Sequence, residues 1–109
     1  MDPDSDSVDR EADRGADREA DREADRVIRA FFRDGRLVSI PARQGKRLFV
    51  LRELRETCFP EDREYPEKEV NMRLALVHPD VAALRRYLVD SKLMSRSNGI
   101  YRRLPGAGA

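Results

Sequence analysis

The chain has 109 residues, which is enough for one domain. It holds one cysteine, so no disulfide can form within it, and this usage is typical of proteins in reducing compartments. No apolar run approaches the roughly 20 residues that cross a bilayer, and the first residues are acidic where a secretory signal would be basic and then apolar. We therefore expect a soluble, cytoplasmic protein with no membrane partner.

The two ends of the chain carry opposite charge. Residues 1–26 hold 11 acidic side chains and 5 arginines, whereas residues 27–109 hold 17 basic and 10 acidic side chains. The overall net charge of +1 hides this division. A basic body is a candidate for binding a polyanion, although arginine-rich surfaces are also common on proteins that bind none.

Residues 9–26 repeat a four-residue unit, DREA, with one DRGA. This low-complexity segment has no apolar stripe to dock on a core, so residues 1–26 are expected to be disordered or a frayed helix. The folded domain is then expected at residues 27–104, followed by a flexible tail at 105–109. A domain of this size has little room for a buried catalytic pocket.

The folded region begins with apolar residues at helical spacing, from Val27 to Phe32. They predict a helix that ends at Asp34-Gly35, with Gly35 as its C-cap. The next segment, residues 36–41, is short and rich in β-branched residues and ends at Pro41. It predicts a strand at a sheet edge.

Three further helices are predicted from apolar periodicity and from proline positions. They span residues 46–58, 65–77 and 79–92, and Asp80 is well placed at the start of the third. Asn98-Gly99 then lies between two β-compatible runs in residues 93–104, which is a strong signal for a two-residue hairpin.

This order of elements predicts an α+β fold, mainly α, that resembles a winged helix-turn-helix. It has an N-terminal helix and a short strand, three core helices and a C-terminal β-hairpin wing. In that fold the third helix can enter the DNA major groove, and the wing contacts the DNA backbone or minor groove. The short strand before the first core helix is expected to pair with the hairpin.

The candidate nucleic-acid contacts are arginines on the third helix and on the hairpin. Ala82, Ala83, Arg86 and Asp90 face away from the apolar side of the helix; the alanines permit close approach to DNA, and Asp90 opposes it. Arg85 lies nearer the core border and could equally fold back onto acidic neighbours. For the hairpin arginines, the alternative is that they contact no nucleic acid and only keep a solvated strand edge soluble. The predicted contacts are Arg85, Arg86, Arg96, Arg102 and Arg103.

Other residues are assigned plainer roles. His78 is the single histidine, so no histidine cluster is available for metal binding or acid–base catalysis, and it is expected to cap the third helix or pack at the break. Cys58 lies on an apolar face, with no base apparent beside it. Phe31, Phe32 and Phe49 are expected in the core or at an interface, and Phe49 in particular would meet the N-terminal helix or another subunit. We expect no enzyme, no cofactor and no metal.

Three stretches carry a resemblance to a known family: FFRDGRLVSIPARQGKRLFVL, YPEKEVN and LRRYLVDSKLMSRSNGIYRR. Together they resemble an uncharacterised bacterial domain family over residues 28–103. That family occurs alone and also fused behind ArsR-type helix-turn-helix regulators. The resemblance implies a small domain proposed to bind nucleic acid in transcription regulation. The matching positions include Phe32, Gly35, Pro41, Tyr65, Glu69, Asn71, Leu84, Arg85, Arg86, Asp90, Arg96, Gly99 and Tyr101.

The chain departs from this family at Pro66, where a serine or threonine usually caps the helix, and at His78-Pro79-Asp80, which replaces a more acidic run. The first change removes a capping box with Glu69. Neither change alters the predicted fold.

We therefore expect a nucleic-acid-binding accessory domain, with duplex DNA as the first candidate and an ArsR-type regulator as a candidate partner. The alternative is a protein-interaction or dimerisation module that forms a homodimer and binds no nucleic acid. A third hypothesis is that the acidic tail folds back and imitates nucleic acid, as opposed to serving as a solubilising extension.

Overall fold

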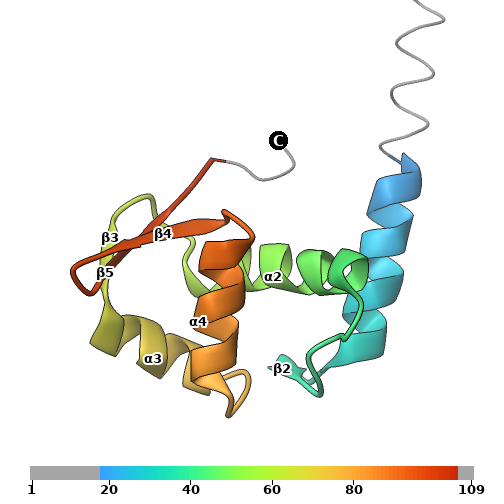
Figure 1. Ribbon diagram of the computed structural model, residues 1–109. Coiled ribbons are helices and arrows are strands. Elements are labelled where there is room, and N and C mark those ends of the chain that lie inside the picture. The colour runs from blue at the N-terminus through green and yellow to red at the C-terminus, as the bar shows by residue number, and fades with distance from the viewer. Residues whose placement is uncertain (1–17, 106–109) are drawn as a thin grey trace, which may run out of the picture.

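The computed structural model describes residues 18–105, which form an α+β domain (Figure 1). Residues 18–31 form an N-terminal helix. It is followed by β1 (Phe32–Arg33), β2 (Arg36–Leu37), α2 (Gln44–Cys58), β3 (Glu64–Pro66), α3 (Glu67–Ala75), α4 (Val81–Asp90), β4 (Met94–Ser97) and β5 (Ile100–Arg103). The predictions of an α+β class and of three core helices after the N-terminal one are confirmed.

The N-terminal helix ends earlier than predicted, because Asp34-Gly35 is a hairpin turn and not a helix C-cap. The helix stops at residue 31, and β1 then pairs antiparallel with β2. Asp34 and Gly35 both have positive φ, 54° and 77°, which is the geometry of a tight two-residue hairpin loop. An Asp-Gly pair between β-compatible residues favours this turn for the same reason as the later Asn-Gly pair.

The predicted strand at residues 36–41 is wrong in length and in partner. It is shortened to β2, which pairs with β1 and not with the C-terminal hairpin. The strand that joins the hairpin is β3, so the helix predicted at 65–77 begins instead at Glu67. The resulting sheet has the order β3-β5-β4, with Tyr65 opposite Tyr101. Pro66 ends β3 at a sheet edge, where its missing N–H is tolerated.

The start of α4 and the C-terminal hairpin agree with the sequence. Asp80 is the N-cap of α4, and its carboxylate accepts a hydrogen bond from the backbone N–H of Ala83 at 3.2 Å. His78 lies just before it, and its Nδ1 accepts from the backbone N–H of Asp80 at 3.0 Å. Asn98 and Gly99 have φ of 52° and 76°, as the turn between β4 and β5 requires.

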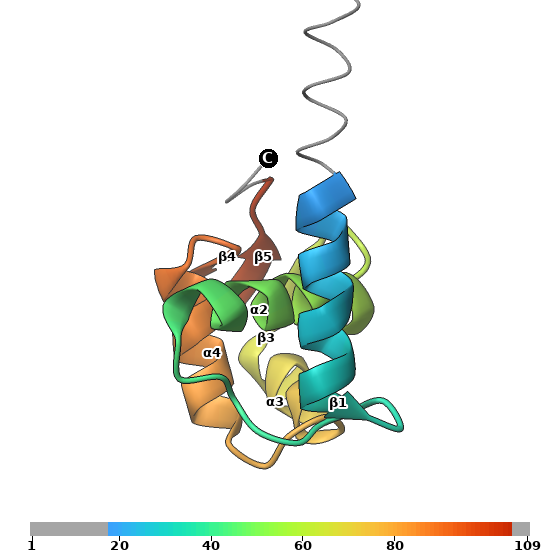
Figure 2. The same cartoon turned by 90° about the vertical axis from the view of Figure 1, so that its right-hand side faces the viewer.

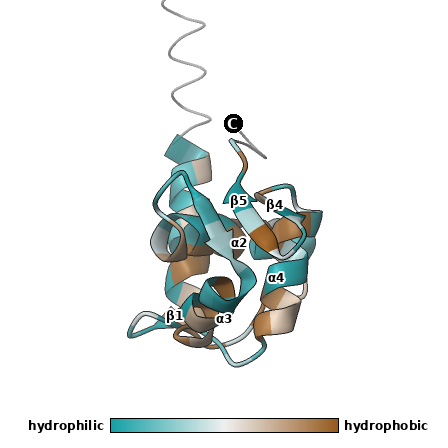
Figure 3. Ribbon diagram, turned by 90° about the vertical axis from the view of Figure 1, so that its left-hand side faces the viewer, coloured by the Kyte–Doolittle hydropathy of each residue, from teal (hydrophilic) through white to brown (hydrophobic). Residues whose placement is uncertain are grey.

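The core lies between α2, α3, α4 and the three-stranded sheet. Phe59 and Tyr65 are fully buried, and their rings meet edge to face at 5.1 Å. The Tyr65 hydroxyl donates to the backbone carbonyl of Glu61 at 2.9 Å, which satisfies its one polar group. Figure 3 shows apolar segments gathered where helices meet, whereas the β1–β2 hairpin is mostly hydrophilic.

The N-terminal helix crosses α2, as Figures 1 and 2 show from two sides. Val27 is buried in this contact, and Phe31, Phe32 and Phe49 pack half-buried against the core. Phe49 shares a surface hollow with Ile28, which places it beside the N-terminal helix. The three phenylalanines therefore stabilise an intramolecular contact.

The described part of the predicted acidic tail, residues 18–26, is helical and continues directly into the docked part of the helix. Its residues are exposed apart from Ala24, which is half-buried. The remaining tail predictions, for residues 1–17 and 106–109, lie outside the described residues. None of the helices in residues 18–105 has the length and apolar content that a membrane span requires.

Two glycines give a matched pair of stability predictions. Gly99 has φ of +76° and Gly45 does not have positive φ, while neither has a heavy atom within 4 Å of the place a Cβ would take. Gly99→Ala is expected to lower the free energy of unfolding by about 1 to 2 kcal/mol, because left-handed backbone strains a residue with a Cβ. Gly45→Ala, in the first turn of α2, should raise it by about 0.5 kcal/mol. Urea denaturation measures both; equal effects of the two variants would contradict the turn geometry.

Candidate functional site

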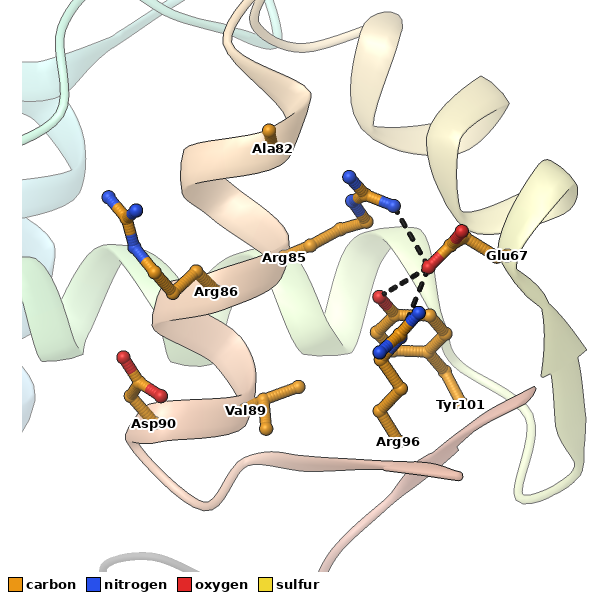
Figure 4. A pocket seen from close by; sticks show the side chains of 8 residues that line it. All are labelled: Glu67, Ala82, Arg85, Arg86, Val89, Asp90, Arg96 and Tyr101. Carbon is orange, nitrogen blue, oxygen red and sulfur yellow. Dashed lines mark hydrogen bonds and ion pairs between the residues drawn. The ribbon is translucent and has the colours of Figure 1, made fainter. Parts of the chain in front are cut away.

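Glu67, the first residue of α3, joins the candidate recognition helix α4 to the β4–β5 hairpin. Its Oε1 accepts hydrogen bonds from Arg96 Nε at 3.1 Å and from the Tyr101 hydroxyl at 3.0 Å. The same oxygen lies 3.0 Å from Arg85 Nη1 (Figure 4). The backbone N–H of Glu67 also donates to the carbonyl of Gly99 at 2.8 Å. One residue at the start of α3 thus bonds both to α4 and to the hairpin.

These contacts hold Glu67 in its charged form. The Tyr101 hydroxyl, with Arg96 and Arg85 in support, lowers the pKa of the Glu67 carboxyl below its usual value. Burial and the bond to Glu67 raise the pKa of Tyr101, so this phenol stays protonated as a donor. Two arginines share one carboxylate, and the cluster therefore keeps one net positive charge.

An open, polar hollow lies between α4 and the hairpin. Figure 4 shows Arg85 and Arg86 extending to opposite sides of α4, so only Arg85 reaches Glu67. Arg86 makes no ion pair with any residue in 18–105, and it is exposed together with Ala82 and Asp90, one helical turn away on either side. The hollow is lined by Glu67, Ala82, Arg85, Arg86, Val89, Asp90, Arg96 and Tyr101.

The last two predicted arginines lie apart from this hollow. Arg102 pairs across the sheet with Glu64, at 3.6 Å. Arg103 points toward the end of α2, where it donates to the carbonyl of Phe59 at 2.7 Å and to Glu56 at 2.9 Å. The five arginines predicted from the sequence therefore do not form one patch. Arg85 and Arg96 meet on Glu67, whereas Arg86, Arg102 and Arg103 point elsewhere.

The sequence reasoning missed a second group of cations beside α4, at the start of α2. The Arg47 guanidinium lies 4.3 Å from the centre of the Tyr87 ring, and that of Arg86 lies 5.7 Å from the same centre. A signal for this group is present in the sequence: no acidic residue occurs between Asp34 and Glu53, although five basic ones do. Such a stretch leaves its cations without local partners.

A second carboxylate, Glu69, stabilises the α3 side of the domain. Arg63 Nη2 donates to Glu69 at 2.6 Å and Arg73 Nε donates to it at 2.7 Å. These bonds, the Arg63 bond foremost, lower the pKa of Glu69 from 4.5 to about 2. Arg63 also lies over the Tyr65 ring at 4.0 Å, so this network braces the buried tyrosine of β3.

Cys58 is buried, and burial raises the pKa of its thiol above the usual value. A protonated thiol is a weak nucleophile. Within residues 18–105, no three His, Cys, Asp or Glu side chains converge as metal ligands would. The hollow beside α4 presents hydrogen-bond donors and positive charge from the guanidinium groups that line it.

Acid unfolding tests the Glu69 network. Its folded-state pKa of about 2 lies below the ordinary 4.5, so the stability it contributes is complete above about pH 4.5 and is lost as the pH falls toward 2. The native chain should therefore show a falling Tm over this range, and Glu69→Gln should show a flatter profile with a lower Tm at neutral pH. Lys68→Gln, at an exposed neighbour, is the control. Parallel profiles for Glu69→Gln and the native chain would contradict the network.

Comparison with protein-family models matches residues 36–103 to a family described as an uncharacterized protein conserved in bacteria, DUF2087. This match agrees with the sequence motifs, which resemble an uncharacterised bacterial family. No curated protein and no solved structure matches the chain. Since the matched residues make up more than half of the chain, this protein belongs to the DUF2087 family of uncharacterized bacterial proteins.

Proposed function

We propose that this domain is a winged helix-turn-helix that binds duplex DNA through α4, as an accessory module in transcription regulation and not as an enzyme. The observation that carries the proposal is the exposed face of α4 in its setting between α3 and the β4–β5 hairpin. An ArsR-type regulator is the candidate partner, because the resemblance carried by the sequence motifs implies a family that also occurs fused to such regulators.

The connectivity supports this reading. The order α2, β3, α3, α4, β4, β5, with a sheet ordered β3-β5-β4, is the order in which a winged helix places its elements. The two helices of the helix-turn-helix would be α3 and α4, with α4 as the recognition helix. The β4–β5 hairpin would be the wing.

The exposed face of α4 supports it as well. Ala82 lies in the first turn of α4, the end with which recognition helices contact base edges, and its short side chain leaves space for a close approach. Arg86 lies one turn further on, at the middle of the helix. Arg86 is suited to a phosphate or to a guanine edge. Asp90 is the last residue of α4 and would be repelled by phosphates, so the part of the helix from Ala82 to Arg86 would enter the groove.

The ion pairs of the wing arginines are expected to limit their contribution to DNA binding. Arg96, Arg102 and Arg103 each have a carboxylate partner, so a DNA phosphate would have to compete with a glutamate for each of them. Their contribution to affinity is therefore expected to be smaller than that of Arg86, which has no such competitor within residues 18–105.

Fluorescence anisotropy with a labelled generic duplex tests the proposal. The native chain should bind at about 50 mM salt and lose affinity steeply toward about 200 mM, as counterion release requires. Arg86→Glu should weaken binding by about 10-fold or more, because it removes one contact and adds repulsion. Arg36→Glu, an equal charge change on the β1–β2 hairpin, is the matched control.

A variant that is expected to raise DNA affinity strengthens this test. Glu67→Gln keeps a side-chain oxygen that can accept from Tyr101 and Arg96, but it removes the negative charge that neutralises Arg85 and Arg96, so it should raise affinity at low salt. Absence of binding by the native chain at low salt, or equal binding by Arg86→Glu and Arg36→Glu, would overturn the proposal. Circular dichroism of each variant checks that the fold is intact.

A protein-interaction module is the second candidate, and exposed apolar residues on α3 and at its C-cap favour it. Met72 and Leu76 lie one turn apart and are 62% and 69% exposed. These residues replace Phe31, Phe32 and Phe49 as the candidate contact surface, because the phenylalanines pack within the chain.

Light scattering distinguishes this candidate from DNA binding. A homodimer that uses this face should dissociate on Met72→Glu combined with Leu76→Glu, because both charges would be buried in the interface. Lys68→Glu on the same helix is the control for added charge. A native chain that is monomeric at high concentration would remove the dimer hypothesis.

A further inference from the structure

We propose that the main phosphate-contacting surface of this domain lies at the start of α2, on a surface made by Arg43, Arg47, Tyr87 and Arg86, and not on the wing. We call it the Tyr87 surface. The inference rests on the proposed DNA binding, and it names the residues that would contact the sugar-phosphate backbone.

Tyr87 brings together cations from two helices. Arg47 comes from the first turn of α2 and Arg86 from α4, and their guanidinium carbons lie 4.3 Å and 5.7 Å from the centre of the same ring. The two guanidinium carbons can therefore be no farther apart than the sum of these two distances. The ring holds both guanidinium groups on one part of the surface through cation–π attraction.

Arg47 is held in place by backbone carbonyls and not by a carboxylate. Its Nη1 donates to the carbonyl of Ala42 at 3.0 Å and to that of Pro41 at 3.3 Å. Its Nε and Nη2 have no acceptor among residues 18–105, so they remain available to an incoming oxygen. A guanidinium that is already fixed loses little side-chain entropy when it binds a phosphate.

Arg43 extends the surface by one helical turn. The backbone N–H of Arg47 donates to the carbonyl of Arg43 at 2.9 Å, which places the two residues one turn apart. Arg43 is exposed, and the first turn of α2 contains no acidic side chain. Within the described chain, none of the three arginines of the Tyr87 surface forms an ion pair.

This absence of neutralising carboxylates separates the Tyr87 surface from the hairpin. Like charges held close together repel one another, and an anion that binds between them relieves that repulsion. On the hairpin, glutamates already do so for Arg96, Arg102 and Arg103. The partner that fits the Tyr87 surface is a phosphodiester backbone, because regularly spaced phosphates can meet several guanidinium groups at once.

Salt-dependent anisotropy with the full chain and a generic duplex tests this assignment. Arg43→Glu is expected to weaken binding by about 5-fold or more at 50 mM salt and to reduce the salt slope by about 1, as loss of one phosphate contact predicts. Arg36→Glu changes the net charge equally on the β1–β2 hairpin and should have a smaller effect. Arg102→Glu makes the same charge change on the wing and should also have a smaller effect than Arg43→Glu.

Tyr87 gives a variant pair that leaves the net charge unchanged. Tyr87→Leu removes the ring that positions Arg47 and Arg86, and it should weaken binding about as much as Arg43→Glu. Tyr87→Phe keeps the ring and should bind like the native chain. Thermal unfolding shows whether Tyr87→Leu is folded, and Arg43→Glu, at an exposed position with no side-chain cap bond, tests the surface without that risk.

The outcomes separate this inference from the proposed function. If the native chain binds DNA but Arg43→Glu behaves like Arg36→Glu, or Arg102→Glu weakens binding more than Arg43→Glu does, the Tyr87 surface is overturned and DNA binding stands. If the native chain binds no duplex at low salt, both fall. Loss of affinity with Arg43→Glu and Tyr87→Leu, but not with Arg36→Glu or Tyr87→Phe, establishes the surface.

Discussion

The carboxylate of Glu67 links three elements that surround the core of this domain. It accepts from Tyr101 and Arg96 on the hairpin and pairs with Arg85 on α4, while its own backbone N–H bonds to the turn at Gly99. Because Glu67 begins α3 directly after β3, these bonds tie the sheet to both of the last two helices. Charge-assisted bonds to one oxygen therefore reinforce, from the surface, the packing of α4 on the core.

The same bonds decide where positive charge is available. Arginines near the hairpin are drawn onto Glu56, Glu64 and Glu67, whereas the acid-free stretch that contains Arg43 and Arg47 has no carboxylate nearby in the sequence. The basic residues of the wing are therefore mostly paired with glutamates, whereas Arg47 and Arg86, which form no ion pair within residues 18–105, lie together against the Tyr87 ring.

Much of the fold could be predicted from the sequence. The main error, a helix predicted to begin at Tyr65, has an identifiable cause. Tyr65-Pro66 has the composition of a helix start, because proline suits a first turn and acidic residues follow. Yet Tyr65 is fully buried opposite Tyr101, and pairing with β5 extends this segment into β3. The strand partner lies more than thirty residues away, so no local pattern in residues 64–66 indicates it.

The sequence by itself determined the features that neighbouring residues control. These are the Asn98-Gly99 turn, the Asp80 cap of α4, the apolar faces of three helices, and the division between an acidic N-terminal segment and a basic body. The tertiary structure alone decided which arginines pair with a carboxylate and which have no such partner within residues 18–105. Turns and caps are set within a few residues of chain, whereas ion pairs form between side chains that only packing brings together, as Arg96 and Glu67 show.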